Sequence, residues 1–185
     1  IGIHLTDVGI IRQIMMSDDN KLSSEEKEYK RKAQQWIVQE GGYMSIQSTK
    51  PQTLAYALSD SPVGLAAWLV EKFYSWSDIS KGFENKYSMD ELLNNVMIYW
   101  LNNSIGASAM MYYENMHTLP PIGKITIPTG IALFAKDVLL PPKVWVEENL
   151  NLNQWSEIPR GGHFTAMEEP ELFSNDICKF YRSLR

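Results

Sequence analysis

The sequence has little cysteine: Cys178 is the only one among 185 residues. A single cysteine excludes an internal disulfide and any metal site built from several thiolates. Cys178 falls in a terminal segment whose apolar residues have helical spacing, so we expect a packed thiol rather than a reactive one.

Long apolar runs are also absent. No segment approaches the roughly 18 residues needed to cross a bilayer. The first residues, Ile1–Leu5, contain neither an initiator Met nor the basic region of a signal peptide, which is typical of the middle of a longer polypeptide. We expect a cytoplasmic protein, and the sequence leaves open whether a membrane anchor lies upstream of Ile1.

Basic side chains are not in excess. The 17 Lys and Arg residues face 22 Asp and Glu residues, which gives a formal charge of −5. Nucleic-acid-binding modules are usually basic, so we predict no nucleic-acid partner. Residues 27–32 form a local basic cluster, but acidic residues alternate with it, as on a solvated helix face.

Helix signals dominate residues 10–118. Ser23–Glu26 and Ser88–Glu91 have capping-box spacing, and Pro51 and Pro62 can each open a helix. Further helices are expected over residues 106–116, around Trp145 and from Pro170 to the C-terminus.

Strand character is limited to three segments, Ile1–Thr6, Lys124–Phe134 and Gln154–Ile158. A doubly wound sheet has helices on both faces and usually more strands than three. The simplest explanation is that the other strands lie upstream, outside this chain. The predicted class is therefore α/β.

The clearest chemical motif surrounds His163. This histidine follows two glycines, whose backbone bends tightly, and lies between a predicted strand and the last helix. In α/β-hydrolases the nucleophile comes first along the chain, then the acid, then a histidine near the C-terminus. The stretch GGHFTAMEEPEL, residues 161–172, resembles the histidine loop of epoxide hydrolases and haloalkane dehalogenases. The alternative is a capping or packing histidine.

A catalytic histidine needs a carboxylate that fixes its tautomer and stabilises the imidazolium. Asp137 comes directly after the Lys124–Phe134 strand, where the acid of this fold would lie. Glu147 and Glu148 are rivals, but they fall in the next predicted helix, where we expect them in solvent.

Two longer stretches narrow the resemblance to microsomal-type epoxide hydrolases. EGGYMSIQSTKPQT (40–53) and ALSDSPVGLAAW (57–68) closely resemble the cap region of that family, and residues 94–100 and 128–130 also match. The resemblance covers nearly the whole chain. It implies the C-terminal portion of an α/β-hydrolase core with a helical cap domain inserted: a core strand in 1–9, the cap in 10–118 and the rest of the core in 119–185.

The resemblance also implies that two cap tyrosines donate hydrogen bonds to the epoxide oxygen. The G-Y-M-x-I-Q motif places one at Tyr43, and the Y-x-E-N motif places the other at Tyr112, with Tyr113 as the fallback. A phenol, with a pKa near 10, polarises that oxygen while it stays protonated at pH 7. Without the motifs, aromatic residues on helices would usually belong to the core.

The nucleophile of the family, an aspartate in G-x-D-x-G, is missing: no G-x-[DSC]-x-G occurs in the sequence. The His-Gly-x-Pro loop that helps form the oxyanion hole is missing too. We therefore expect the upstream half of the hydrolase domain as a partner. Either that half is a separate chain, or this chain is a fragment of a longer polypeptide that contains both halves. The chain alone is predicted to be inactive.

The implied reaction has two steps. The upstream aspartate opens the epoxide and forms an ester, and water activated by His163 and Asp137 hydrolyses that ester to a diol. No metal or organic cofactor is implied, and His4 and His117, which lack ligand-like spacing, are expected to be structural or exposed. A homo-oligomer stays open.

Two alternatives stay open for the function. A haloalkane dehalogenase or another capped α/β-hydrolase would share the histidine loop, but the Tyr43 motif favours an epoxide. A catalytically inactive fragment or scaffold fits the missing nucleophile, but it would have no need to keep His163, its acid and both tyrosines.

Overall fold

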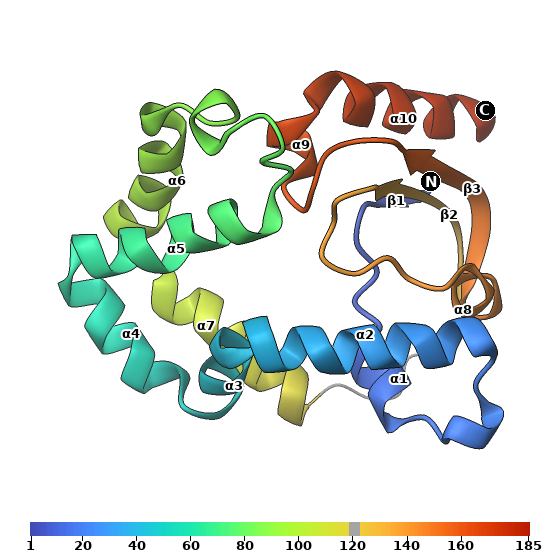
Figure 1. The fold of residues 1–185 in the computed structure, drawn as a ribbon, viewed down its shortest axis with the longest axis horizontal. Helices are drawn as coiled ribbons and strands as arrows, with labels where there is room; N and C mark the ends of the chain where they lie inside the picture. The colour runs from blue at the N-terminus through green and yellow to red at the C-terminus, as the bar shows by residue number, and fades with distance from the viewer. Residues whose placement is uncertain (119–122) are drawn as a thin grey trace. The chain divides into compact units, whose positions relative to one another are not determined.

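The computed structural model describes residues 1–118 and 123–185, so the expected domain boundary after residue 118 borders a stretch outside the described residues. Figure 1 shows the elements, which are β1 (Ile3–Leu5), α1 (Ile11–Met16), α2 (Ser24–Glu40), α3 (Gly42–Thr49), α4 (Pro51–Asp60), α5 (Pro62–Trp76), α6 (Met89–Leu101), α7 (Ile105–His117), β2 (Ile125–Phe134), α8 (Lys143–Asn149), β3 (Leu150–Ile158), α9 (Thr165–Glu168) and α10 (Pro170–Ser183). Short 3-10 turns cover Asp19–Lys21 and Phe83–Asn85.

The three strands form one parallel sheet in the order β1-β2-β3. Leu5 lies opposite Ile131, and Phe134 lies opposite Ile158, so the carboxyl ends of all three strands meet at one edge of the sheet. The three predicted strands are confirmed, although β3 begins at Leu150 rather than at Gln154. All three strands therefore deliver the residues that follow them to the same edge.

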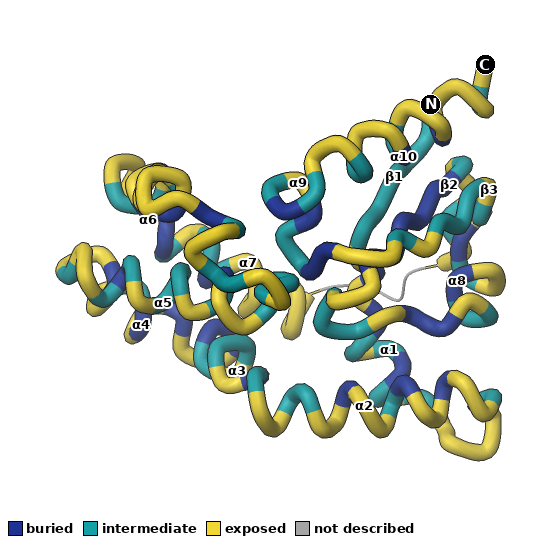
Figure 2. The backbone as a smooth tube through the Cα atoms, turned by 45° about the horizontal axis from the view of Figure 1, so that its top comes forward, coloured by how far each residue is buried: buried dark blue, intermediate teal, exposed yellow. Residues whose placement is uncertain are grey.

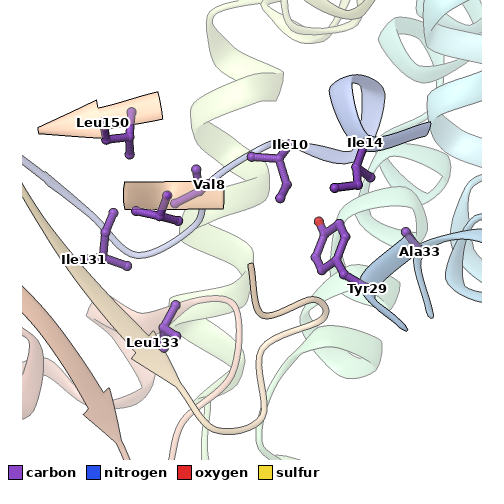
Figure 3. Packing of buried hydrophobic residues seen from close by; sticks show 9 residues of the cluster. Val8, Ile10, Ile14, Tyr29, Ala33, Ile131, Leu133 and Leu150 are labelled. Atoms are coloured by element: carbon purple, nitrogen blue, oxygen red, sulfur yellow. The ribbon is translucent and has the colours of Figure 1, made fainter. Parts of the chain in front are cut away.

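Both faces of the central strand, β2, are covered, as a parallel sheet requires. On one face α10 packs so closely that a Cβ on Gly130 would lie 2.8 Å from the ring of Phe180. The other face carries Ile131 and Leu133, which belong to a buried cluster with Ile14 and other residues of α1, α2 and α8 (Figure 3). Cover on both faces explains why every residue of β2 from Thr129 to Phe134 is buried, instead of every second one.

Helices α3 to α7 have a core of their own. Its buried residues come from α4, α5, α6 and α7, and they are Leu54, Leu58, Leu65, Val96 and Ile105. The predicted capping box at Ser88 is present: its hydroxyl accepts the N–H of Glu91, whose carboxylate accepts the N–H of Ser88. The start of α6 that the sequence predicted is therefore present in a helix that also contributes to this core.

The chain divides into two compact units. Unit 1 contains Ile1–Trp36, Trp76–Asp78 and Ile122–Arg185, and unit 2 contains Ile37–Ser75 and Ile79–Pro121. This differs from the expected cap of residues 10–118, because α1 and most of α2 group with the sheet. The physical reason is burial: Ile14, Tyr29 and Ala33 lie in the same core as Ile131.

Some local features differ from expectation. Cys178 is exposed, so the prediction of a packed thiol is wrong; on α10 the buried positions are Asp176 and Phe180. Figure 2 shows this helix with one exposed side along its length. Within residues 1–118 and 123–185, no helix combines the length and the hydrophobicity needed to cross a membrane.

Candidate active site

His163 and Asp137 are joined by a hydrogen bond in unit 1. The distance from Nδ1 of His163 to Oδ1 of Asp137 is 2.9 Å. The same carboxylate oxygen accepts the N–H of Val138 at 2.7 Å, and the side chain of Asp137 is only 3% exposed. Asp137 follows β2 and His163 follows β3, so the parallel pairing of these strands brings the two residues together. The expected hydrogen bond between them is present.

The rival acids lie elsewhere. Glu147 and Glu148 are exposed on α8, and Glu147 pairs with Lys143 at 3.6 Å. This agrees with the expectation that both are solvated, and it leaves Asp137 as the carboxylate bonded to the His163 ring.

Charges around His163 favour its protonated form. Burial acts to lower the pKa of His163, but the hydrogen bond and charge of Asp137 act in the opposite direction. The carboxylates of Asp7 and Glu168 add to that effect, and the net pKa of His163 is raised. An imidazole in this setting is therefore prepared to accept a proton and to be stabilised as the cation.

Asp7 is a site residue that the sequence patterns missed. It comes two residues after β1, as Asp137 comes three residues after β2, and the two strands are parallel neighbours. Although the residue keeps an exposed surface, partial removal from water and then the charge of Asp137 raise the pKa of its carboxyl group. His163 opposes this shift. The available signal was an acid at the carboxyl end of a predicted strand.

Tyr43 and Tyr112 meet in unit 2, on α3 and α7. Their ring centroids are 5.7 Å apart and the planes are nearly perpendicular, at 80°. Burial raises the pKa of Tyr112, while hydrogen bonds with Tyr43 and Gln47 act to lower it. Tyr113 stacks instead on His117 of its own helix, at 4.1 Å between centroids. The structure thus brings Tyr112, and not the fallback Tyr113, to Tyr43.

A cation lies over the ring of Tyr43. The Nζ atom of Lys72 lies 5.2 Å from the centroid of the Tyr43 ring, within the range of a cation–π contact. Glu40 and Glu71 hold that ammonium at 3.4 and 2.8 Å. Lys72 therefore helps to fix the ring of Tyr43.

The other two histidines have structural contacts. Nε2 of His4 lies 2.8 Å from Oδ2 of Asp176, and both side chains are under 10% exposed, at 4% and 7%. His117 bonds through Nδ1 to the carbonyl O of Tyr113, one turn earlier. Within the part of the chain that the structure describes, no group of three His, Cys, Asp or Glu residues could hold a metal ion.

Comparison with known proteins gives consistent relatives. No protein-family model matches the chain. It is 43% identical to epoxide hydrolase 1 of Oryctolagus cuniculus over 165 residues, and 46% identical to epoxide hydrolase 1 of Sus scrofa over 156 residues. These matches cover 82% and 78% of the chain. The solved structure of Aspergillus niger epoxide hydrolase covers 98% of the chain with a TM-score of 0.76 and 28% identity.

The matches cover only part of each relative. The chain spans 36% of the Oryctolagus cuniculus protein, 34% of the Sus scrofa protein and 46% of the Aspergillus niger structure. The similarity therefore extends along most of this chain and over less than half of each of these proteins.

Proposed function

Because the chain belongs to the epoxide hydrolases of the α/β-hydrolase superfamily, we propose that it contributes to an enzyme that opens an epoxide to a vicinal diol. In this proposal unit 1 is part of the hydrolase core and unit 2 is the cap. The chain would supply the histidine, its acid and the two oxygen-binding tyrosines. The nucleophilic aspartate and the oxyanion loop would come from a segment outside these 185 residues.

The observation that carries the proposal is the meeting of Tyr43 and Tyr112. A His–Asp couple serves many hydrolases, whereas two adjacent phenols suit a leaving oxygen that stays attached to the substrate. When the nucleophile attacks, the ring C–O bond breaks and its electron pair remains on the oxygen. Two phenol O–H groups stabilise that developing alkoxide, and a proton from one of them completes the alcohol.

The second step is assigned to His163 and Asp137. His163 takes a proton from water through Nε2, and the resulting hydroxide attacks the ester carbonyl. The ester C–O bond breaks, and the imidazolium gives its proton to the departing oxygen, so that the diol leaves. The carboxylic acid that forms on the nucleophile then loses its proton, and a proton taken up from solvent restores the phenol that was deprotonated in the first step. Asp137, bonded to Nδ1, holds the tautomer that leaves Nε2 free to accept a proton and stabilises the cation that forms.

A haloalkane dehalogenase is the second candidate, because it would use the same histidine couple. A halide leaves without a proton and needs N–H donors, not a pair of phenols close to each other. The tyrosine pair therefore favours the epoxide.

The test uses the complete enzyme, meaning these residues together with the segment that carries the nucleophile. His163→Gln should block the second step after the first has occurred, so the protein should gain the mass of the epoxide. Intact-protein mass spectrometry should find that adduct, while the unchanged enzyme releases diol. An unchanged enzyme that forms no diol from any aryl or alkyl epoxide would contradict the proposal.

The tyrosine assignment has a matched control in Tyr113. Tyr43→Phe and Tyr112→Phe should each slow ester formation by about 10- to 1,000-fold, since one preorganised donor is lost. Tyr113→Phe should leave that rate within about twofold of the unchanged enzyme, because its ring stacks on His117. Rapid-mixing measurements of ester formation distinguish these results, and equal losses in all three variants would reject the assignment.

A further inference from the structure

A three-residue segment, Trp76–Asp78, belongs to unit 1 although unit 2 flanks it on both sides in the sequence. We call it the strap. Its backbone runs against the first part of the histidine loop, residues 161–164, which is called the loop below: the carbonyl O of Trp76 accepts the N–H of His163 at 2.9 Å. A Cβ on Gly162 would lie 2.5 Å from that oxygen. The loop and the strap are therefore in close backbone contact, for which glycine is needed at residue 162.

Glu168 joins the loop to the strap. Its carboxylate accepts three backbone N–H bonds: Oε2 accepts from Asp78 at 2.8 Å and from Gly162 at 2.9 Å, and Oε1 accepts from Phe164 at 3.0 Å. The residue is only 6% exposed. A buried carboxylate is costly unless it is hydrogen-bonded, and these three donors satisfy it. One side chain thus fixes both segments.

The same segments surround the His163 ring. The ring of Trp76 meets it edge to face, with 5.3 Å between centroids, and also stacks at 15° on Phe164. The side chain of Asp78 also contacts the loop, because its Oδ2 accepts the N–H of Gly161 at 3.2 Å. A shift of the loop away from the strap would therefore move the imidazole relative to Asp137.

We propose that Glu168 is a positioning residue for His163, a role that rests on the function proposed for His163 above. It locks the histidine loop to the strap, so that the ring keeps its hydrogen bond to Asp137. A carboxylate is required because both of its oxygens receive N–H donors. A glutamine would turn its NH₂ group toward at least one of those donors and lose that bond.

The charge of Glu168 acts in the same direction. The groups that face His163 are Asp137 after β2, Asp7 after β1 and Glu168 on α9, together with the rings of the strap and loop. Each of the three carboxylates acts to raise the pKa of His163. Loss of the Glu168 charge should therefore lower that pKa, which a purely structural defect elsewhere would leave unchanged.

Glu168→Gln in the complete enzyme is the test, with Glu169→Gln as the matched control. Glu169 is the next residue, but its carboxylate pairs with Arg160 at 2.8 Å. Displacement of a catalytic group by about 1 Å costs about 100-fold in rate, so ester hydrolysis should fall toward that extent in Glu168→Gln alone. Ester formation should stay within about twofold, because the tyrosines and the nucleophile are unchanged. The pKa of His163, followed by NMR, should fall.

The proposal is overturned if Glu168→Gln matches Glu169→Gln in both the hydrolysis rate and the pKa of His163. Should Glu168→Gln not fold, Glu168→Asp replaces it: the charge is kept but the reach is shorter, so hydrolysis should slow while ester formation is retained. If even the unchanged enzyme forms no ester, the proposed function fails. The pKa of His163 in the same proteins then still decides the role of Glu168.

Discussion

At the scale of one residue, a substitution of Asp7 distinguishes an effect of its charge on His163 from an effect of its packing. Its negative charge helps to raise the pKa of His163. Asp7→Asn removes that charge, so the pKa of His163 should fall. Ester hydrolysis requires neutral His163 and declines as pH falls through its pKa; the acid limb of the hydrolysis profile should therefore move to lower pH. The control is Glu171→Gln, an exposed acid on α10, which should leave the limb in place.

The same substitution should stabilise the fold. The pKa of Asp7 is raised in the folded protein, so ionisation opposes folding once the pH exceeds the unfolded value near 4. Asp7→Asn removes this penalty, and thermal unfolding at pH 7 should occur at a higher temperature than in the unchanged protein. A lower melting temperature together with an unmoved acid limb would show that Asp7 acts through packing.

Sequence motifs were the source of most of the proposed site residues. His163, Tyr43 and Tyr112 stand in recognisable strings, and Asp137 follows a clear strand. Asp7 also follows a predicted strand, but it stands in no recognisable motif, and its effect on Asp137 and His163 depends on which strands lie side by side. Glu168 stood inside the histidine motif, but the bond that it accepts from the N–H of Asp78 joins residues 90 apart in the sequence.

At the scale of elements, the capping box of α6 gives a stability prediction. Ser88→Ala removes the hydroxyl that accepts the N–H of Glu91, and such a change costs about 1 kcal/mol. Asn94→Ala, at an exposed position of the same helix, should cost nothing comparable. Urea denaturation measures both.

The pKa of Glu91 is lowered by the cap bonds, so this stabilisation is present above the unfolded pKa of Glu91 and is lost as the pH falls. Equal urea midpoints for Ser88→Ala and Asn94→Ala would show that the Ser88 cap does not stabilise the fold.

Local signals predicted where most helices begin and failed where packing decides. The starts of α4, α5 and α10 at proline follow from the missing N–H of that residue. Helix α3 was not predicted, because Gly41 and Gly42 indicate a break. It forms beside α7, with Tyr43 against Tyr112, so its stability depends on a contact distant in sequence.

At the scale of the whole molecule, the sequence did not predict which helices share a core. Apolar periodicity assigned residues 10–118 to one helical block. The apolar face of a helix indicates that this face is buried, but it does not indicate which other element covers it. The structure groups residues up to Trp36 with the sheet, where Tyr29 and Ala33 pack in the core of β2. The α/β class was nevertheless predictable, because three strand-like segments stand among many helix signals in the sequence.

The last prediction concerns the isolated 185-residue chain. Among the described strands β1 pairs only with β2, so one of its edges has unpaired N–H and C=O groups. Large apolar side chains are exposed on α6 and α7, among them Ile98, Leu101 and Met111. Such an edge and such surfaces promote association. We expect the isolated chain to form oligomers or to precipitate, and to convert no epoxide, since the sequence lacks the G-x-D-x-G nucleophile motif.

Light scattering after size-exclusion chromatography measures the association, and diol formation measures the activity. Addition of the segment that carries the aspartate should give a defined complex and restore diol formation, because the paired edge and the nucleophile then come from the same partner. His163→Gln in that complex should accumulate the ester, which shows that the restored activity uses the site described above. A soluble monomer of the isolated chain that turns over epoxide would contradict the prediction, since one of its own residues would then have to be the nucleophile.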